Sequence, residues 1–460
     1  MLIRSVLREV ARQGLRTTAL SEGHPALGLG VKKYIHTSKK MASSKLQMAK
    51  RLEGTDQNVW VEFGRLTVEN QALNLGQGFP DFFPPDYVRD GLLKSVSDEN
   101  PFLQQYTRSY GHPRLIKALA QTYSPILKRE IDPMSEILVT VGAYGSLFCT
   151  VQGLLNPGEE AIIIEPYFDC YEPMVKVAGG TPVFVPLRPT KTGTTLSSAD
   201  WKLDQKELES KFTSKTKLLF LNNPNNPLGK VYSLEELQMI ADLCIKNDVI
   251  CVADEVYEWM IYPGHKHLKI ATLPGMWERT VTIGSAGKTF SVTGWKLGWS
   301  VGPKNLIHAL QTMHQNCVYT CPTPIQEAVA RGFELENARF GQKDCYFQSL
   351  ADELLPKRDK MQAFLAEVGM VPTIPEGGYF MIADFSKLDI KTDPDSKESK
   401  DFQFVKWLIR NKKVAGIPPS AFYSQEHKHL AENLIRFCFI KEDSSLDKAA
   451  EIIREWKKEL

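Results

Sequence analysis

Residues 281–299 read VTIGSAGKTFSVTGWKLGW. The apolar run at 281–283 predicts a buried strand, and a turn of small residues, GSAG, follows it. Lys288 comes directly after this turn. Small neighbours leave room for a flat ligand, and burial would lower the pKa of the amine and make it nucleophilic. A lysine that reaches solvent from a tight turn would explain the same pattern.

Further short apolar runs precede this stretch, and each ends in a cluster of Gly, Pro or Asn. They cover residues 137–141, 161–164, 182–185, 217–221 and 250–253. Between the last two runs, residues 234–247 show apolar residues at helical spacing and a charged face. Strands that alternate with helices predict an α/β fold, with a largely parallel sheet covered on both faces.

The pattern changes after about residue 325. Longer helices are predicted over 325–339 and 344–368, and GGYFMIADF (377–385) and LIRFCF (434–439) alternate like half-exposed strands. This favours a second, smaller α+β domain. We predict that residues 45–84 form an N-terminal arm and part of that small domain, that 85–324 form a large cofactor-binding domain, and that 325–460 complete the small one.

The charge of the chain is unevenly distributed. The 460 residues carry a net charge of +2, but residues 1–50 hold ten Lys or Arg and only two acids. Four arginines at positions 4, 8, 12 and 16 would share one face of a helix. This is typical of a mitochondrial transit peptide, predicted at 1–44, although a basic disordered tail would look similar. We expect a matrix enzyme, with a cytosolic form that starts at Met41.

Polar residues follow the predicted strands where ligands bind in α/β sheets. Asp254 ends the run 250–253, and a carboxylate there could keep a cofactor's ring nitrogen protonated. A helix N-cap would explain this residue equally well. Tyr257 follows one turn later and could direct its hydroxyl to the same site.

Two other strings carry chemistry of their own. LNNPNNPLGK (221–230) fixes an unusual backbone path, and Asn226 could donate to a phenolate-type oxygen, although a plain turn would also fit. VGAYGSLF (141–148) reads as a strand, a glycine turn and a helix start, whose backbone N–H groups could bind phosphate. It lacks the spacing of a Walker loop.

Together these strings resemble the fold type I aminotransferases, which use pyridoxal 5′-phosphate. The resemblance runs from about residue 50 to the C-terminus. Five strings are similar to the kynurenine aminotransferase branch, also called glutamine transaminase K or cysteine-S-conjugate β-lyase: LEGTDQNVWVEF, LNLGQGFPDFFPP, QQYTRSYG, EPYFDCYEPM and IPPSAFYS. The resemblance implies transamination of L-kynurenine, glutamine, methionine and aromatic amino acids with 2-oxo acids. Kynurenine would give kynurenic acid, and β-lyase activity is implied as well.

The resemblance also implies roles for individual residues. Lys288 matches the lysine that holds the cofactor and moves the proton at the substrate Cα. Asp254 matches the acid that pairs with the ring nitrogen, and Asn226 and Tyr257 match the pair that binds the ring oxygen. Arg436, in LIRFCF, matches the clamp for the substrate α-carboxylate, whereas the residues alone would also allow an ordinary ion pair.

The remaining assignments are implied in the same way. The resemblance assigns phosphate binding to Ala143, Tyr144, Ser285 and Lys296. Relatives carry arginine at the position of Lys296. Phe168 matches the ring stacked on the cofactor, with Tyr167 one position away as the alternative. Tyr106 matches a residue that reaches the phosphate of the other subunit in a homodimer. Trp60, Gly78 and Tyr110 match strings that line the entrance, with Asn226 beside them, although Trp60 could equally be packed in the core.

Other functions receive less support. An aminotransferase with aromatic or broad neutral specificity is the nearest alternative, and the lack of a string for a second arginine disfavours dicarboxylate substrates. A non-catalytic, cofactor-binding regulator would need a DNA-reading module, and no helix-turn-helix pattern is present. A nicotinamide dehydrogenase is disfavoured because the GxG at 28–30 follows no strand. We expect no nucleic-acid, membrane or metal binding.

Overall fold

The computed structural model describes residues 47–56 and 58–459. The chain divides into two units, Met1–Glu53 and Gly54–Leu460. The predicted transit peptide at 1–44 lies outside the described residues. A short helix, η1 (Lys50–Leu52), belongs to the first unit, and every element discussed below belongs to the second.

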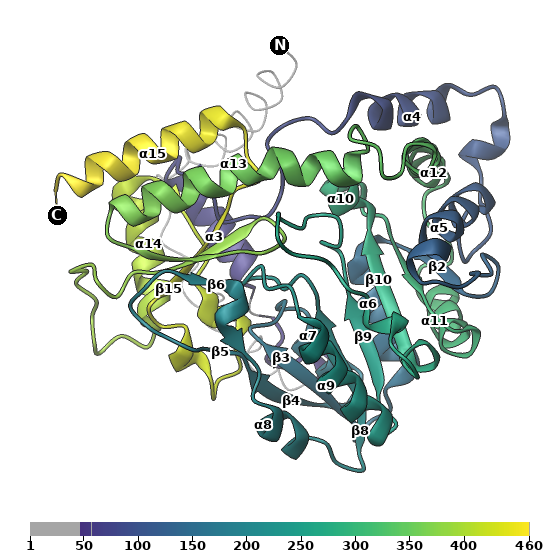
Figure 1. Cartoon of the computed structure of the whole chain (residues 1–460), viewed down its shortest axis with the longest axis horizontal. Helices are drawn as coiled ribbons and strands as arrows, with labels where there is room; N and C mark the ends of the chain where they lie inside the picture. Colours follow the sequence, from purple (N-terminus) through teal and green to yellow (C-terminus); the bar gives the residue numbers. More distant parts are fainter. Residues whose placement is uncertain (1–46, 57, 460) are drawn as a thin grey trace, which may run out of the picture. The chain divides into compact units, whose positions relative to one another are not determined.

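The largest sheet of the second unit has seven strands (Figure 1). Their order is β2 (Ile137–Thr140), β11 (Gly298–Val301), β10 (Thr280–Ser285), β9 (Ile250–Asp254), β8 (Thr216–Asn222), β3 (Glu160–Glu165) and β4 (Thr181–Pro186). Only β11 runs antiparallel to its neighbours β10 and β2 in this sheet. The predicted α/β fold with a mostly parallel sheet is therefore confirmed.

Helices cover both faces of this sheet because its strands are apolar on both sides. One face packs against α5 (Pro113–Ile126), α9 (Leu234–Lys246) and α12 (Thr323–Ala338). The other face packs against α6 (Gly142–Leu154), α7 (Tyr171–Val177) and α11 (Lys304–Cys317). Successive strand residues alternate between these cores, so that Leu138 joins one and Val139 the other.

A smaller sheet lies beside the large one (Figure 1). Its order is β15 (Leu434–Cys438), β13 (Phe380–Asp384), β12 (Val371–Ile374) and β6 (Leu196–Ser197). It shares a core with α3 (Val59–Glu69), α13 (Tyr346–Glu367), α14 (Lys400–Lys412) and α15 (Asp443–Lys457). The expectation of half-exposed strands at 377–385 and 434–439 is wrong, because all of β15 and all of β13 except Asp384 are buried. The domain boundaries stay predictions.

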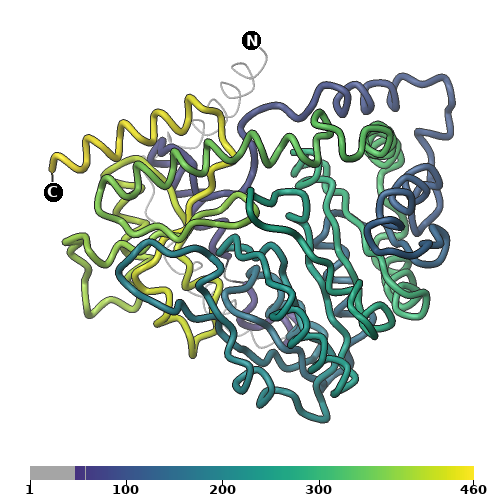
Figure 2. The backbone as a smooth tube through the Cα atoms, viewed as in Figure 1, coloured from purple at the N-terminus to yellow at the C-terminus, as the bar shows by residue number. Residues whose placement is uncertain are grey.

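The two ends of the second unit lie together. In Figure 2 the purple segment with α3 runs beside the segment with α14, and Phe63 packs edge-on against Phe402 with ring centroids 5.5 Å apart. Strand β1 (Leu73–Asn74) also pairs in parallel with β14 (Val414–Ala415). Residues from both ends of the sequence are thereby brought to one place.

Helix α4 (Asp86–Ser97) packs against α12. The shorter elements include α8 (Gln205–Ser210), α10 (Ala286–Thr289), the paired strands β5 (Arg188–Pro189) and β7 (Trp201–Lys202), and several 3-10 helices. Among the described residues, no helix combines the length and the apolar character that crossing a bilayer requires.

Candidate active site

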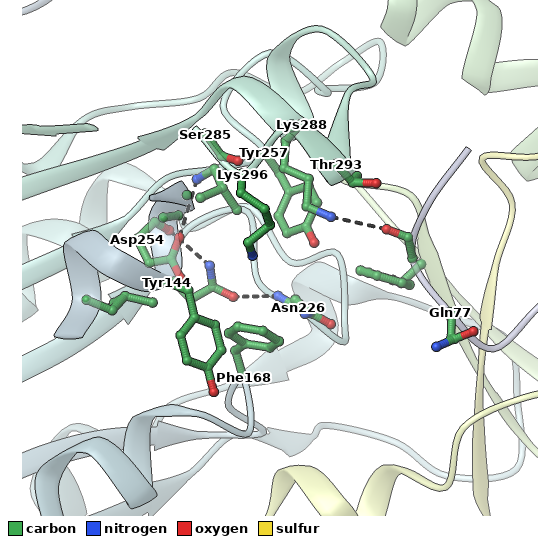
Figure 3. A pocket seen from close by; sticks show the side chains of 18 of the residues that line it. Gln77, Tyr144, Phe168, Asn226, Asp254, Tyr257, Ser285, Lys288, Thr293 and Lys296 are labelled. Carbon is green, nitrogen blue, oxygen red and sulfur yellow. Dashed lines mark hydrogen bonds between the residues drawn. The ribbon is translucent and has the colours of Figure 1, made fainter. Parts of the chain in front are cut away.

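A cavity of about 290 Å³ opens at the carboxyl ends of the central strands (Figure 3). Asn222 ends β8, Asp254 ends β9 and Ser285 ends β10, and all three line the cavity. Twelve of the fourteen predicted site residues line it: Trp60, Gly78, Ala143, Tyr144, Phe168, Asn226, Asp254, Tyr257, Ser285, Lys288, Lys296 and Arg436. Tyr106 and Tyr110 do not.

Lys288 enters the cavity from α10, directly after β10. Its Nζ donates to the Gly78 carbonyl oxygen at 3.1 Å and to the Tyr379 hydroxyl, and it lies 5.5 Å from the centroid of the Tyr257 ring. Burial, assisted by the positive charge of Arg436, lowers the pKa of this amine to about 8. A neutral, nucleophilic amine is therefore accessible close to physiological pH.

Asp254 is a buried carboxylate with few partners. Its Oδ2 accepts a hydrogen bond from the Tyr171 hydroxyl at 2.5 Å, and its Oδ1 has only a long contact, 3.4 Å, with the Val256 amide. Burial raises the pKa of Asp254 to about 6, and the bond from Tyr171 opposes that rise. The chain continues into turns, and the next helical element begins only at Ile270, so Asp254 is not a helix N-cap.

Asn222 connects the two strand ends, and the sequence did not single it out. Its side-chain nitrogen donates to the Asp254 carbonyl oxygen at 2.9 Å, and its side-chain oxygen accepts from the Asn226 amide at 2.6 Å. One amide side chain therefore holds the backbone of two other cavity residues. The string LNNPNN holds four asparagines, one at the end of β8 and three after it, and nothing in that string distinguishes Asn222 from its neighbours.

Arg436 lies on β15 and is fully buried. Its Nη1 donates to Asn226 Oδ1 at 2.9 Å and its Nη2 to the Gly76 carbonyl oxygen at 2.8 Å. The rings of Phe380, Phe422 and Trp60 surround its guanidinium, with centroids 4.0, 5.0 and 5.1 Å from Cζ.

No acidic residue within the described part of the chain forms an ion pair with Arg436. Its Nε is buried and has no hydrogen-bond partner. Burial lowers the pKa of the guanidinium to about 10, which still leaves it charged at neutral pH. A buried charge without a counter-ion is costly, so this site is built for an anionic ligand.

The other end of the cavity can hold a second anion. Helix α6 begins at Gly142, whose φ of +70° suits glycine, and no side chain caps its first N–H groups. Ala143 and Tyr144 at this helix start line the cavity together with Ser285 and Lys296. An uncapped helix N-terminus beside a lysine and a hydroxyl fits a phosphate group.

Aromatic side chains form the wall between these two ends. Phe168 lines the cavity, whereas Tyr167 does not, because its hydroxyl donates to Glu172 at 2.6 Å. Tyr144 packs edge-on against Phe168 with ring centroids 6.1 Å apart (Figure 3). Trp60 both lines the cavity and donates to Asp169 Oδ2 at 2.7 Å. Sequence reasoning also missed the lining residues Gln77, Thr293 and Phe380.

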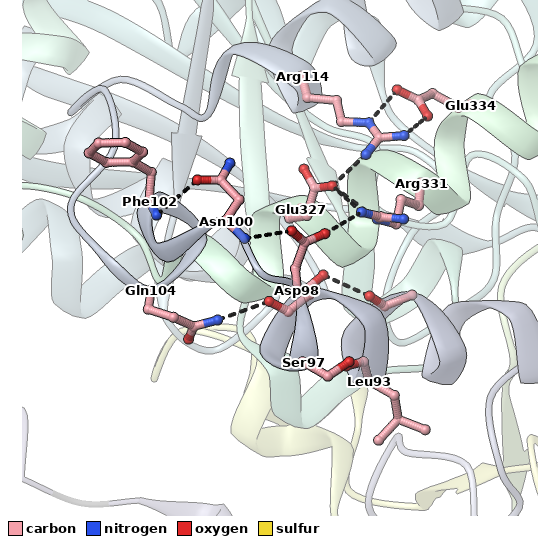
Figure 4. A network of polar contacts seen from close by, with 12 residues as sticks. Leu93, Ser97, Asp98, Asn100, Phe102, Gln104, Arg114, Glu327, Arg331 and Glu334 are labelled. Carbon is pink, nitrogen blue, oxygen red and sulfur yellow. Dashed lines mark hydrogen bonds and ion pairs between the residues drawn. The ribbon is translucent and has the colours of Figure 1, made fainter.

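Tyr106 and Tyr110 lie outside this lining. Tyr106 is 82% exposed and packs edge-on against Tyr319, and the Tyr110 hydroxyl donates to Gln315. A polar network ties the segment before Tyr106 to α12 (Figure 4). In it, Arg331 contacts Asp98 at 3.7 Å and Glu327 at 2.8 Å. The exposed tyrosine therefore stands on a well-anchored segment.

The model of aminotransferase classes I and II matches residues 70–453. The chain belongs to this aminotransferase family. Kynurenine–oxoglutarate transaminase 3 of Homo sapiens is 58% identical over 91% of this chain and 92% of its own length. Kynurenine–oxoglutarate transaminase 1 of Homo sapiens is 51% identical over 91% of this chain and its own full length.

Solved structures agree with the family. The structure of Bna3p, a candidate kynurenine aminotransferase of Saccharomyces cerevisiae, matches with a TM-score of 0.85 and 34% identity over 91% of this chain and all of its own. YbdL of Escherichia coli, with a methionine aminotransferase function, matches with a TM-score of 0.78 and 29% identity over 89% of this chain and all of its own. Aminotransferases of this family depend on pyridoxal 5′-phosphate, and the cavity fits that cofactor with an amine, a carboxylate and a phosphate site.

Proposed function

We propose that this aminotransferase takes the amino group of L-kynurenine, and also of glutamine, methionine and aromatic amino acids, and passes it to 2-oxo acids. Kynurenine then yields kynurenic acid. The observation that carries the proposal is the fully buried guanidinium of Arg436, which has no acidic partner among the described residues and lines the same cavity as the Lys288 amine. The names of the relatives, kynurenine–oxoglutarate transaminases 1 and 3, support kynurenine as a donor.

Arg436 would bind the α-carboxylate, which all amino acids share. A guanidinium matches the two oxygens of a carboxylate, so it selects α-amino acids as a class. Among the described residues that line the cavity, Arg436 is the one arginine, which disfavours donors with a second carboxylate. Trp60 and Phe380, which lie beside Arg436, provide aromatic surface that suits the ring of kynurenine.

The chain's own residues would divide the chemistry among them. Pyridoxal phosphate supplies an electron sink for the pair released when the substrate Cα loses its proton. Lys288 would hold the cofactor at rest, and its freed amine would take that proton from Cα and return it at C4′ of the cofactor. Asp254 stabilises positive charge on the ring nitrogen, and Asn226 and Tyr257 bind the ring oxygen.

The phosphate is held by Ser285, Lys296 and the N-terminus of α6. The ammonium of a lysine is a compact charge, whereas the guanidinium of an arginine is planar and has donors in fixed directions. Lys296 would therefore bind phosphate less directionally than an arginine would. Phe168 gives the cofactor ring a flat neighbour.

The same residues serve cysteine-S-conjugate β-lyase activity, which we propose as a side reaction. Once Lys288 removes the Cα proton, the electron pair left at Cα would form a second bond between Cα and Cβ. The bond from Cβ to sulfur breaks, and the thiolate leaves with its electron pair. No additional residue is required for this outcome.

Two further proposals concern the whole enzyme. We propose a homodimer in which Tyr106 reaches the phosphate of the other subunit, which would account for its exposure on an anchored segment. We also propose that residues 1–44 direct the enzyme to the mitochondrial matrix and that a product starting at Met41 stays in the cytosol, based on the charge pattern of the sequence.

An absorption spectrum of the purified enzyme tests the substrate proposal. L-kynurenine is added without any oxo acid, and a 2-oxo acid follows. We expect the band of the lysine-bound cofactor to disappear and then to return. If kynurenine leaves the band unchanged while another amino acid removes it, the enzyme belongs to the alternative with aromatic or broad neutral specificity.

A further inference from the structure

Tyr171 contacts the carboxylate of Asp254 from outside the cavity. It begins α7, is 1% exposed, and is absent from the cavity lining. Its hydroxyl lies 2.5 Å from Asp254 Oδ2, and it is the one side chain within the described residues that donates to this carboxylate. Burial raises the pKa of the Tyr171 hydroxyl well above its usual value, so the phenol keeps the proton that it donates.

Packing fixes the direction of this hydroxyl. The Tyr171 ring stacks on Phe220 of β8 with centroids 4.7 Å apart and planes 16° from parallel. It also stacks with Tyr167 at 6.4 Å, and Phe168 meets it edge-on at 6.1 Å. A ring held in this way cannot turn its hydroxyl elsewhere without breaking core contacts.

The contacts of Asp254 leave one oxygen available. Oδ2 is taken by Tyr171, whereas Oδ1 has only the 3.4 Å contact with the Val256 amide, which is too long for a strong hydrogen bond. A carboxylate that is buried without a donor tends to become protonated and turns freely about its last torsion. The bond from Tyr171 opposes both changes.

We propose that Tyr171 is a positioning residue that orients the Asp254 carboxylate and keeps it ionised for the ring nitrogen of the cofactor. The inference rests on the proposed role of Asp254 in cofactor binding. Tyr171 acts only through Asp254, so its hydroxyl matters for cofactor affinity and turnover and not for recognition of the amino donor.

The test removes one hydroxyl and leaves the ring stack intact. Tyr171→Phe is compared with Tyr167→Phe, a matched control in the same stack whose hydroxyl bonds to Glu172 instead. The dissociation constant for pyridoxal phosphate is measured by titrating apoenzyme, and kcat and KM are measured with L-kynurenine and glutamine. Circular dichroism and thermal midpoints check that both variants fold.

We expect Tyr171→Phe to raise the cofactor dissociation constant and to lower kcat by about ten- to a hundredfold, the range for a hydrogen bond to a charged group. KM for both donors stays within about threefold of the wild type, and Tyr167→Phe changes none of these values more than about twofold. A Tyr171→Phe variant that behaves like Tyr167→Phe overturns the inference.

A double-mutant cycle separates this inference from the proposed function. With Asp254→Asn as the background, Tyr171→Phe is expected to add less than about twofold to the cofactor dissociation constant. An equally large effect in both backgrounds means that Tyr171 acts independently of Asp254 and refutes the inference alone. If Asp254→Asn binds the cofactor as tightly as the wild type, the role of Asp254 itself fails.

Discussion

Lys288 differs from the buried lysines Lys269 and Lys230 in the charge of its partners. Lys269 is bound by both Glu255 and Glu258, and Lys230 lies 2.9 Å from Glu236. The bonds of Lys288 go to a carbonyl and a phenol, which are both neutral. Burial without an adjacent carboxylate favours the uncharged amine, which is the form that reacts with an aldehyde.

The pH dependence of cofactor attachment follows from this environment. Because the pKa of Lys288 is lowered to about 8, the neutral amine predominates above that pH and becomes scarce below it. We expect the rate at which apoenzyme attaches pyridoxal phosphate to rise with pH and to reach half its maximum near pH 8. Stopped-flow absorption measures that rate. Lys288→Ala should fold and show no attachment, and a midpoint above pH 10 would contradict the lowered pKa.

Arg436 leads to a prediction about substrates. Its removal takes away the carboxylate partner that every amino donor shares, and loss of such a buried charge contact costs about 2–5 kcal/mol. We expect Arg436→Ala to lower kcat/KM by about a hundredfold for kynurenine, glutamine, methionine and phenylalanine alike. Steady-state assays with each donor provide the measurement. A loss confined to one donor would show that Arg436 reads side chains instead.

Residue-level prediction from the sequence succeeded where a residue type has few uses at a strand end. A lysine in a turn of small residues and an aspartate that closes an apolar strand could be selected from the sequence. Asn222 and Tyr171 could not be selected, because each has residues of the same type close by in the sequence. The paths of α7 and of the turns after β8 decide which asparagine and which tyrosine contact Asp254. Such choices depend on contacts between segments far apart in the sequence.

At the scale of elements, the contact between β11 and α6 shapes the phosphate end of the cavity. Gly298 begins β11, and a Cβ atom there would lie 2.4 Å from the Ala143 amide nitrogen and 2.5 Å from the Gly142 carbonyl carbon. Real atoms do not approach so closely, so a side chain at position 298 must displace the start of the helix.

Substitution of Gly298 therefore weakens the phosphate site. Overpacking typically costs about 1–3 kcal/mol, and we expect Gly298→Ala to raise the dissociation constant for pyridoxal phosphate by about tenfold. Fluorescence titration of apoenzyme measures it. Gly294→Ala serves as the control, because a Cβ there meets nothing within 4 Å. Equal affinity in the two variants would mean that the start of α6 does not hold the phosphate.

The elements themselves were predictable to different degrees. Six strands of the large sheet agree with their predicted runs within about two residues, because branched apolar residues bounded by Gly, Pro and Asn have few alternatives. Strand β11, GWSV, was missed because four residues without alternation carry no signal, and pairing with β10 and β2 decides it. Strand β15 was expected to be half-exposed because its residues alternate, but the whole strand is buried and its charged residue, Arg436, lines the cavity.

At the scale of the whole molecule, Tyr106 allows a test of the dimer. If Tyr106 serves the phosphate of the other subunit, the defects of Tyr106→Ala and Lys288→Ala fall in the same site of a hybrid dimer. One site then carries both defects and the other carries none. Tyr106→Ala and Lys288→Ala chains are mixed in equal amounts and refolded together. Random pairing makes about half of the dimers hybrid, so activity should return in about a quarter of all sites. No recovery would place the action of Tyr106 within its own subunit.

The N-terminal segment leads to a prediction about location. Residues 1–44 carry most of the excess positive charge and four arginines at helical spacing, which import receptors of mitochondria favour. A fusion of residues 1–44 to a fluorescent reporter should overlap with a mitochondrial marker in living cells. Replacing the arginines at positions 4, 8, 12 and 16 with glutamine should abolish that overlap. Diffuse fluorescence from the unaltered fusion would refute the targeting role.

The late position of Arg436 affects the order in which the enzyme is synthesised. All strands of the large sheet, together with Lys288 and Asp254, precede β15 in the chain and therefore leave the ribosome before it. The nascent chain then carries the groups proposed to bind the cofactor before it carries the proposed clamp for amino acids. A premature stop codon shortly before residue 434 would yield a chain that keeps the groups for pyridoxal phosphate and has lost its means of holding a substrate.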